Sequence, residues 1–184
     1  MKLLIASDLH GGADACQKLC EIFAQSGADK LVLLGDILYH GPRNDLPEGY
    51  APKRVIPQLN AIADKIVCVR GNCDAEVDGM VLDFALDAEC VTLDLPYGKA
   101  HLTHGHHYDE ARPMPMGERD VLVHGHSHVA GVTRCVTGQY CINPGSLSIP
   151  KEGTPPSYIL LQDGVFSLRR LADGMEWAKV GENA

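Results

Sequence analysis

The chain has 184 residues, of which 45% are hydrophobic and 22% charged, and 16 Lys and Arg against 24 Asp and Glu give a net charge of −8. This is the composition of a globular protein, and at roughly 150 residues per domain it predicts a single domain over residues 1–184. The negative charge argues against a stable nucleic-acid complex. Phosphate chemistry is not excluded, because a bound divalent metal can reverse the local charge.

The chain shows no targeting or membrane signal. Its apolar segments are too short to span a bilayer, and the apolar run at the N-terminus stops at Ser7-Asp8, too soon for a signal peptide. The seven cysteines form no Cys-x-x-Cys motif, so we expect small buried side chains rather than a disulfide framework. The sequence therefore predicts a cytoplasmic protein without a membrane partner.

The first seventy residues alternate strands and helices. Three apolar runs have the character of buried parallel strands, at 2–6, 30–34 and 66–69. The first helix is predicted between two of these runs, with Asp14 and Gln17 at capping-box spacing and Gly27 as its stop. A second helix is predicted to begin near Pro52, with a kink or a late start because Pro57 lies inside its pattern. This part of the chain is a βαβαβ unit.

After residue 85 the pattern changes to short strands with tight turns. The predicted strands are 90–93, 100–103, 121–124, 131–136, 140–143, 158–162 and 165–170. Thr137-Gly138 and Asp163-Gly164 lie where two-residue hairpin turns would. Parallel units followed by hairpins favour a mixed sheet, or two packed sheets, with helices outside. The Pro- and Gly-containing stretch 40–52 is a long loop of the kind that is often functional.

Five short motifs follow the ends of predicted strands. They are Asp8-Leu9-His10, Gly35-Asp36, Gly71-Asn72-Cys73-Asp74, His104-Gly105-His106 and Gly125-His126-Ser127-His128. Ligands of open α/β sheets bind beyond the carboxyl ends of the strands, so we expect these loops to lie together. The candidate metal ligands are Asp8, His10, Asp36, Asn72, His104, His126 and His128. Oxygen and imidazole ligands suit Mn²⁺, Fe²⁺ or Zn²⁺, and seven groups suit two ions that share a carboxylate.

Each motif taken singly has a plainer interpretation. Asp8 and Asp36 are also typical caps of a following turn, a Gly-Asn pair after a strand is commonly just a turn, and His-x-His alone is a weak metal signal. All five motifs, however, follow strands, and this shared position favours a metal site over chance.

In this order, the motifs Asp-x-His, Gly-Asp, Gly-Asn-x-Asp, His-Gly and Gly-His-x-His resemble the calcineurin-like metallophosphoesterase superfamily, over residues 2–149. Gly-Asn-Cys-Asp and segments 40–44 and 143–146 are similar to its small bacterial and archaeal phosphodiesterase branch. The resemblance implies an α/β fold, a four-layer αββα sandwich of two mixed β-sheets flanked by helices. It also implies a first metal ion on Asp8, His10, Asp36 and His128, and a second on Asp36 (bridging), Asn72, His104 and His126.

The implied activity is hydrolysis of small phosphodiesters or nucleotides by a hydroxide that bridges two divalent ions. Mn²⁺ is the first choice, and Fe²⁺, Zn²⁺ and Ni²⁺ are alternatives. Asn72, Cys73 and His104 are the predicted catalytic residues. Many members carry a His that helps protonate the leaving group where this chain has Cys73, a weak acid, so His106 is the other candidate acid. Arg43 and His106 are the predicted substrate contacts, and the Asp74 carboxylate is expected to orient a ligand.

The alternative function is a catalytically weak interaction scaffold. The small subunit of the eukaryotic retromer coat resembles the same fold, but it departs from the full ligand set that this chain retains. The sequence therefore favours the enzyme. The resemblance also allows a homo-oligomer.

Overall fold

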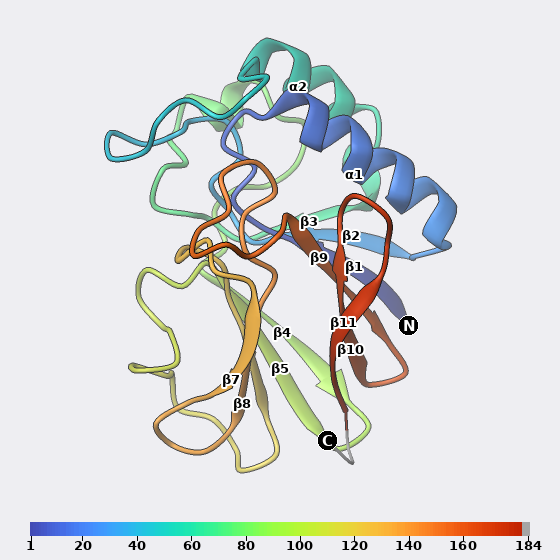
Figure 1. The fold of residues 1–184 in the computed structure, drawn as a ribbon, viewed down its shortest axis with the longest axis vertical. Helices are drawn as coiled ribbons and strands as arrows, with labels where there is room; N and C mark the ends of the chain where they lie inside the picture. The colour runs from blue at the N-terminus through green and yellow to red at the C-terminus, as the bar shows by residue number, and fades with distance from the viewer. Residues whose placement is uncertain (182–184) are drawn as a thin grey trace.

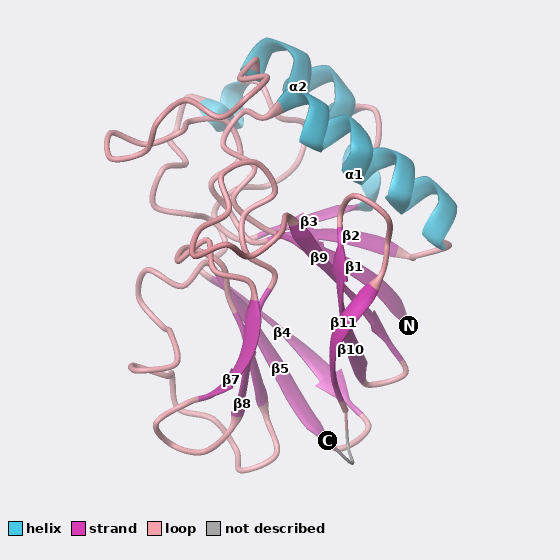
Figure 2. Ribbon diagram, in the orientation of Figure 1, coloured by secondary structure: helices cyan, strands magenta, loops and turns pink. Residues whose placement is uncertain are grey.

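The computed structural model describes residues 1–181, so the last three residues of the domain predicted over 1–184 lie outside the described part. Two β-sheets pack face to face, and the α-helices of the described chain cover the outside of one of them (Figure 1, Figure 2). The helices are α1 (Ala13–Ser26), α2 (Pro52–Asn60) and the short 3-10 helices η1 (Ala63–Lys65) and η2 (Asp78–Met80).

The first sheet has six strands within residues 1–181, in the order β11-β10-β9-β1-β2-β3. Their bounds are β1 (Lys2–Ala6), β2 (Lys30–Leu33), β3 (Ile66–Cys68), β9 (Ser157–Gln162), β10 (Val165–Arg170) and β11 (Glu176–Val180). The strands β1, β2 and β3 are parallel, because α1 and α2 return the chain to the same end of the sheet. The other three pair antiparallel, and Asp163-Gly164 forms the predicted hairpin turn, with φ of 53° and 79°.

The second sheet has five strands within the same residues, in the order β4-β5-β6-β8-β7. Their bounds are β4 (Cys90–Leu95), β5 (Gly98–Thr103), β6 (Val121–Val123), β7 (Gly131–Arg134) and β8 (Tyr140–Asn143). The pairs β5–β6 and β6–β8 are parallel, and the outer pairs are antiparallel, so this sheet is mixed like the first. The predicted sandwich of two mixed sheets is confirmed.

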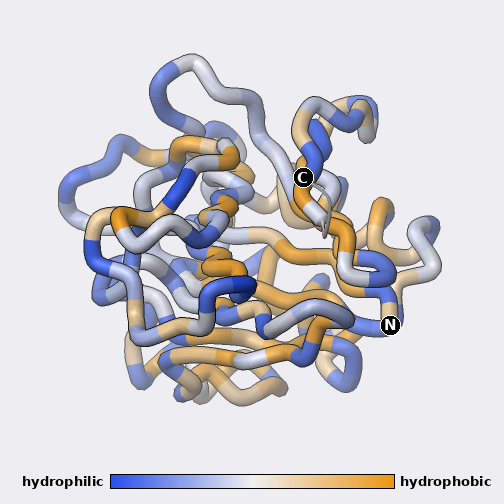
Figure 3. Tube along the Cα trace, turned by 90° about the horizontal axis from the view of Figure 1, so that it is seen from below, coloured by the Kyte–Doolittle hydropathy of each residue, from blue (hydrophilic) through white to orange (hydrophobic). Residues whose placement is uncertain are grey.

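Apolar side chains form three layers. One lies between the helices and the six-stranded sheet and includes Leu19, Phe23 and Leu33. The second lies between the two sheets, where Ile5 and Leu102 are fully buried. Figure 3 shows long hydrophobic stretches of the chain trace, with many of the hydrophilic segments in peripheral loops. Burial of both faces explains why β1 and β2 are continuous apolar runs rather than alternating ones.

The outer face of the five-stranded sheet is covered differently. Met114 and Met116 lie in the long connection between β5 and β6, and they pack on Leu122 and the buried Cys135 and Cys141. Among the described residues this layer is formed by a loop, whereas helices form the corresponding layer of the other sheet (Figure 2).

The helix boundaries agree with the sequence predictions except at the start of α1. The predicted capping box is wrong: Gly12 is the N-cap of α1, no side chain caps it, and Asp14 lies in the first turn and pairs with Arg54 at 3.0 Å. Helix α2 begins at Pro52 as predicted, and it continues through Pro57 instead of starting after it. Gly27, in the left-handed conformation, ends α1 as expected.

The described residues contain no helix long and apolar enough to cross a membrane. All seven cysteines are free thiols; four of them are buried, as expected of small apolar side chains, and Cys20, Cys73 and Cys90 are partly exposed.

Candidate metal centre

The seven predicted ligands lie in five loops that follow strands of both sheets. Asp8 and His10 follow β1, Asp36 follows β2, Asn72 follows β3, His104 follows β5, and His126 and His128 follow β6. Backbone hydrogen bonds of 2.8 Å join these loops, from His10 N to Asp36 O within one sheet and from Gly125 N to His104 O within the other. The His126 N–H donates to Asp8 Oδ2 at 2.9 Å and so connects the two sheets.

The first group of ligand atoms belongs to Asp8, His10 and His128. Nε2 of His128 lies 3.2 Å and Nε2 of His10 lies 3.5 Å from Asp8 Oδ1, and the two nitrogens are 3.1 Å apart. All three residues are at least 98% buried. Three donor atoms that converge on one point in the interior are the arrangement a cation needs.

The second group belongs to Asp36, Asn72, His104 and His126. Nε2 of His104 lies 3.4 Å from Asp36 Oδ2, 3.0 Å from Asn72 Oδ1 and 3.3 Å from Nδ1 of His126. Asp36 also faces the first group, because its Oδ2 is 3.6 Å from Nε2 of His10. One carboxylate oxygen therefore lies between the two groups.

Backbone carbonyls orient three of the four imidazoles. Nδ1 of His10 and of His104 lie 2.7 Å from the carbonyls of Tyr39 and Leu34, and Nδ1 of His128 lies 3.0 Å from a third carbonyl. An N–H at Nδ1 that donates to a carbonyl leaves the lone pair on Nε2, which in each case points into the cluster. This is the usual orientation of an imidazole that binds a metal.

The backbone of the site is strained. Five of the predicted ligands have left-handed φ: 54° at Asp8, 45° at His10, 56° at Asp36, 66° at His126 and 62° at His128. For a residue with a side chain this conformation costs on the order of 1–3 kcal/mol, and it persists where the surroundings impose it. Such a concentration of strain at polar residues marks a functional site.

Two glycines of the motifs are needed for close packing. A Cβ added at Gly125 would lie 1.9 Å from Ser7 Oγ and 2.4 Å from Asp8 Oδ2, and one added at Gly71 would lie 2.2 Å from Asp36 Oδ1. Each glycine therefore leaves the room in which a predicted metal-binding carboxylate lies.

Asp74 holds two of the loops together. Its carboxylate accepts the backbone N–H groups of Asp36 at 2.8 Å, Ile37 at 2.8 Å and Gly71 at 2.7 Å. Burial raises the pKa of Asp74, while these hydrogen bonds counteract the rise. The orienting role expected of Asp74 would thus act on the backbone of the predicted ligand Asp36, through its N–H.

The donor atoms themselves indicate that a cation belongs here. Asp8 Oδ1 is buried and accepts no hydrogen bond, although two imidazole nitrogens lie beside it. Burial alone raises the pKa of Asp8, but the neighbouring imidazoles of His10 and His128 hold it well below its usual range. Likewise, contact with Asp36 and the charge of Asp8 outweigh burial and raise the pKa of His104 to about 9. Carboxylates, an amide oxygen and imidazoles fit divalent transition metals.

The predicted acids lie beside the second group. Cys73 is half-buried, its N–H donates to Asp36 Oδ1 at 2.8 Å, and burial together with the charge of Asp36 raises the pKa of its thiol to about 12. The ring of His106 is 5.4 Å from that of His104, and burial and the surrounding histidines lower its pKa to about 4. At neutral pH the thiol is therefore protonated and the His106 ring is neutral.

A pocket of about 340 Å³ opens onto the ligands. Its lining includes Asp36, Asn72, Cys73, His126 and His128, and also Arg43 and Lys151. Arg43 thus lies where a substrate contact is expected, whereas His106 does not line this pocket. Sequence reasoning missed Lys151, which follows Pro150 without any motif; its N–H donates to the His128 carbonyl at 2.9 Å.

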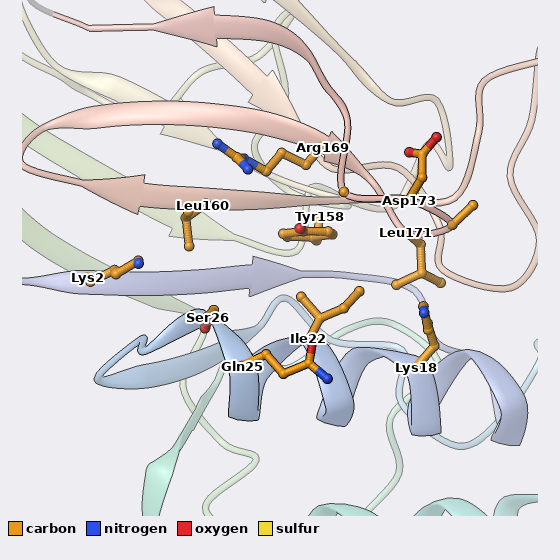
Figure 4. Close-up of a pocket in the computed structure, with 12 residues that line it drawn as sticks. Lys2, Lys18, Ile22, Gln25, Ser26, Tyr158, Leu160, Arg169, Leu171 and Asp173 are labelled. Carbon is orange, nitrogen blue, oxygen red and sulfur yellow. The ribbon is translucent and has the colours of Figure 1, made fainter.

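Pocket size alone does not identify the candidate site. A pocket of about 400 Å³ lies on another part of the surface, where Ile22 and Gln25 of α1 face Tyr158 of β9 (Figure 4). It contains none of the predicted site residues.

The two mixed sheets and the ligand loops at their edge agree with the class of protein that the motifs indicated. Residues 1–163 match the family described as the calcineurin-like phosphoesterase superfamily domain, and the chain belongs to this superfamily. Over 184 residues it is 47% identical to phosphodiesterase YfcE of Escherichia coli K12, covering 100% of this chain and 99% of YfcE.

Solved structures agree with this assignment. The structure of YfcE, a phosphoesterase from E. coli, superposes with a TM-score of 0.92 and 46% identity, covering 98% of this chain and 99% of that one. A Vps29 single mutant from Entamoeba histolytica shares the fold with a TM-score of 0.61 and 21% identity, covering 98% and 99% of the chains.

Proposed function

We propose that this protein is a metal-dependent phosphodiesterase that hydrolyses small phosphodiesters or nucleotides. The observation that carries the proposal is the pair of ligand groups with Asp36 Oδ2 between them, within 3.6 Å of His10 Nε2 and 3.4 Å of His104 Nε2. Membership of the superfamily and the similarity to a protein named phosphodiesterase support it.

In this proposal the seven side chains hold two divalent ions. The first ion is assigned to Asp8, His10, Asp36 and His128, and the second to Asp36, Asn72, His104 and His126. Mn²⁺ is the proposed ion, with Fe²⁺, Zn²⁺ and Ni²⁺ as alternatives, because the donor atoms are oxygen and imidazole nitrogen. When bound, two such ions would polarise phosphoryl oxygens and lower the pKa of a water molecule between them, as the proposed hydroxide attack requires.

Charge and acidity around the proposed ions would govern substrate binding and protonation of the leaving group. Asn72 adds a ligand without negative charge and so leaves the site more attractive to an anionic diester. Arg43 and Lys151 supply positive charge around the pocket. Cys73 and His106 are the candidate acids for protonating the leaving group, and the high pKa of the Cys73 thiol makes it a weak proton donor.

The test is removal and return of metal. Chelation should abolish hydrolysis of an aryl phosphodiester, and Mn²⁺ should restore it best among the divalent ions tried. The same treatment of Asp36→Asn should restore little activity. Full activity of the stripped wild-type protein would refute the proposal.

The scaffold function is less well supported. The likeness to Vps29 concerns the fold alone, while this chain keeps a donor atom at every predicted ligand position. A cytoplasmic location, a homo-oligomer, the absence of a nucleic-acid complex and a single domain over 1–184 stay predictions.

A further inference from the structure

A second group of side chains of the types that bind metals lies on the outer side of the five-stranded sheet. It consists of Glu110 from the loop between β5 and β6, His124 directly after β6, and Cys141 in β8. One donor atom from each residue lies within 4.8 Å of the others. None of the three belongs to the metal centre described above.

Both ring nitrogens of His124 lie beside acceptor groups, one on the backbone and one on Glu110. The two hydrogens of Asn143 Nδ2 are directed to Gly125 O at 2.8 Å and Ser127 Oγ at 2.9 Å, so neither is left for His124 Nδ1 at 3.4 Å. His124 Nδ1 lies 2.9 Å from Gly125 O and donates to it. Its Nε2 lone pair then faces Glu110 Oε2 at 3.0 Å. Two acceptors at this distance require a proton or a cation between them.

The surroundings suit a cation. Glu110, His124 and Cys141 line a cavity of about 140 Å³, which is large enough for an ion and water. His124 and Cys141 are 3% and 2% exposed, whereas the Glu110 side chain is 49% exposed and lies on the solvent side of the group. The Glu110 carbonyl accepts the Val136 N–H at 2.9 Å, which fixes this part of the loop against the β7–β8 hairpin.

We propose that Glu110, His124 and Cys141 bind a Zn²⁺ ion at a site separate from the dinuclear centre. Imidazole, carboxylate and thiolate are all common zinc ligands, and water from the open side completes four ligands. The thiol proton leaves to solvent as the Zn–S bond forms. The carboxylate and the thiolate together then balance the two positive charges of the ion.

Such an ion would stabilise the loop that forms the outer layer. Glu110 belongs to the loop, Cys141 belongs to β8, and His124 directly follows the neighbouring strand β6. His124 is also two residues before His126, so the ion would fix the start of a ligand loop of the dinuclear centre.

Co²⁺ is the probe, because a cobalt–thiolate bond gives a near-ultraviolet charge-transfer band that oxygen and imidazole ligands do not give. Wild-type protein saturated with Co²⁺ should show this band and bind one ion more per chain than Cys141→Ser. Cys73→Ser is the matched control, since Cys73 is the thiol beside the dinuclear centre, and it should keep the band. Competition with Zn²⁺ should remove the band in both proteins that show it.

Glu110→Gln tests the same site without changing a buried residue. It should keep the band but weaken Co²⁺ binding roughly tenfold or more, because the ligand charge is lost. A wild-type protein without the band, a band that persists in Cys141→Ser, or a band lost in Cys73→Ser would each overturn the proposal. In that case Glu110 and His124 form an ion pair only.

Discussion

Replacing Asp74 by Asn should loosen the metal centre without touching a ligand side chain. The carboxylate accepts three backbone N–H groups through both oxygens, whereas an amide has a single oxygen. Whichever way the amide turns, the N–H of Ile37, or those of Asp36 and Gly71, loses its acceptor. A hydrogen bond to a charged group contributes about 1.5–3 kcal/mol. The melting temperature should therefore fall by roughly 3–12 °C, and metal affinity by about 10–100-fold.

Asp78→Asn is the matched control. Asp78 is also a buried carboxylate, but it accepts one backbone N–H, from Ala75 at 2.9 Å, which an amide oxygen can replace. Thermal unfolding by circular dichroism and calorimetric titration with Mn²⁺ measure both effects. If Asp74→Asn matches Asp78→Asn in melting temperature and metal affinity, the reasoning is wrong.

Four further predictions concern the site. Asp36→Asn should lose more bound metal and more turnover than His10→Ala, because Asp36 faces both ligand groups; two ions and near-normal turnover would exclude a bridging role. Metal affinity should rise with pH up to about 9, because the pKa of His104 is raised to about 9 and the ring must lose its proton before it can bind a metal. Calorimetry in buffers of different ionisation enthalpy measures this proton release. A pH-independent affinity would contradict the prediction. Alkyl diesters should react more slowly than aryl ones, because an alkyl leaving group needs protonation and Cys73 is a weak acid; help from a good general acid is worth ~10²–10⁴-fold. A plot of log(kcat/KM) against leaving-group pKa should be steep in wild type and flatter in Cys73→His. A shallow wild-type slope would indicate another acid. Lys151→Ala should raise KM at unchanged metal content, and an unchanged KM would remove this lysine from substrate binding.

The candidate ligands could be predicted because each follows its strand within a few residues. Asp8 lies two residues after β1 and Asp36 three after β2, so local sequence determines which end of the sheet they occupy. Parallel pairing then brings the loops together, as it does for His104 and His126 in the other sheet. The strand pattern in the sequence was therefore sufficient to predict that these loops lie together.

Features that depend on distant contacts could not be predicted. Strand β11 is an edge strand whose Trp177 is 41% exposed, and it exists through pairing with β10 rather than through a hydrophobic pattern. The start of α1 is fixed by a backbone bridge between Gly12 and Tyr50, not by a capping side chain. Lys151 reaches the pocket because its backbone binds the His128 loop, which leaves no signal in the sequence.

The left-handed backbone of five predicted ligands has a consequence for the evolution of the protein. Glycine adopts this conformation freely, so replacing the half-buried His126 by glycine would relieve the backbone while removing a predicted metal ligand. Selection for thermal stability alone, with no demand for turnover, should therefore favour losing the ligand at this position. A descendant released from catalysis would be expected to become more stable as it became inactive.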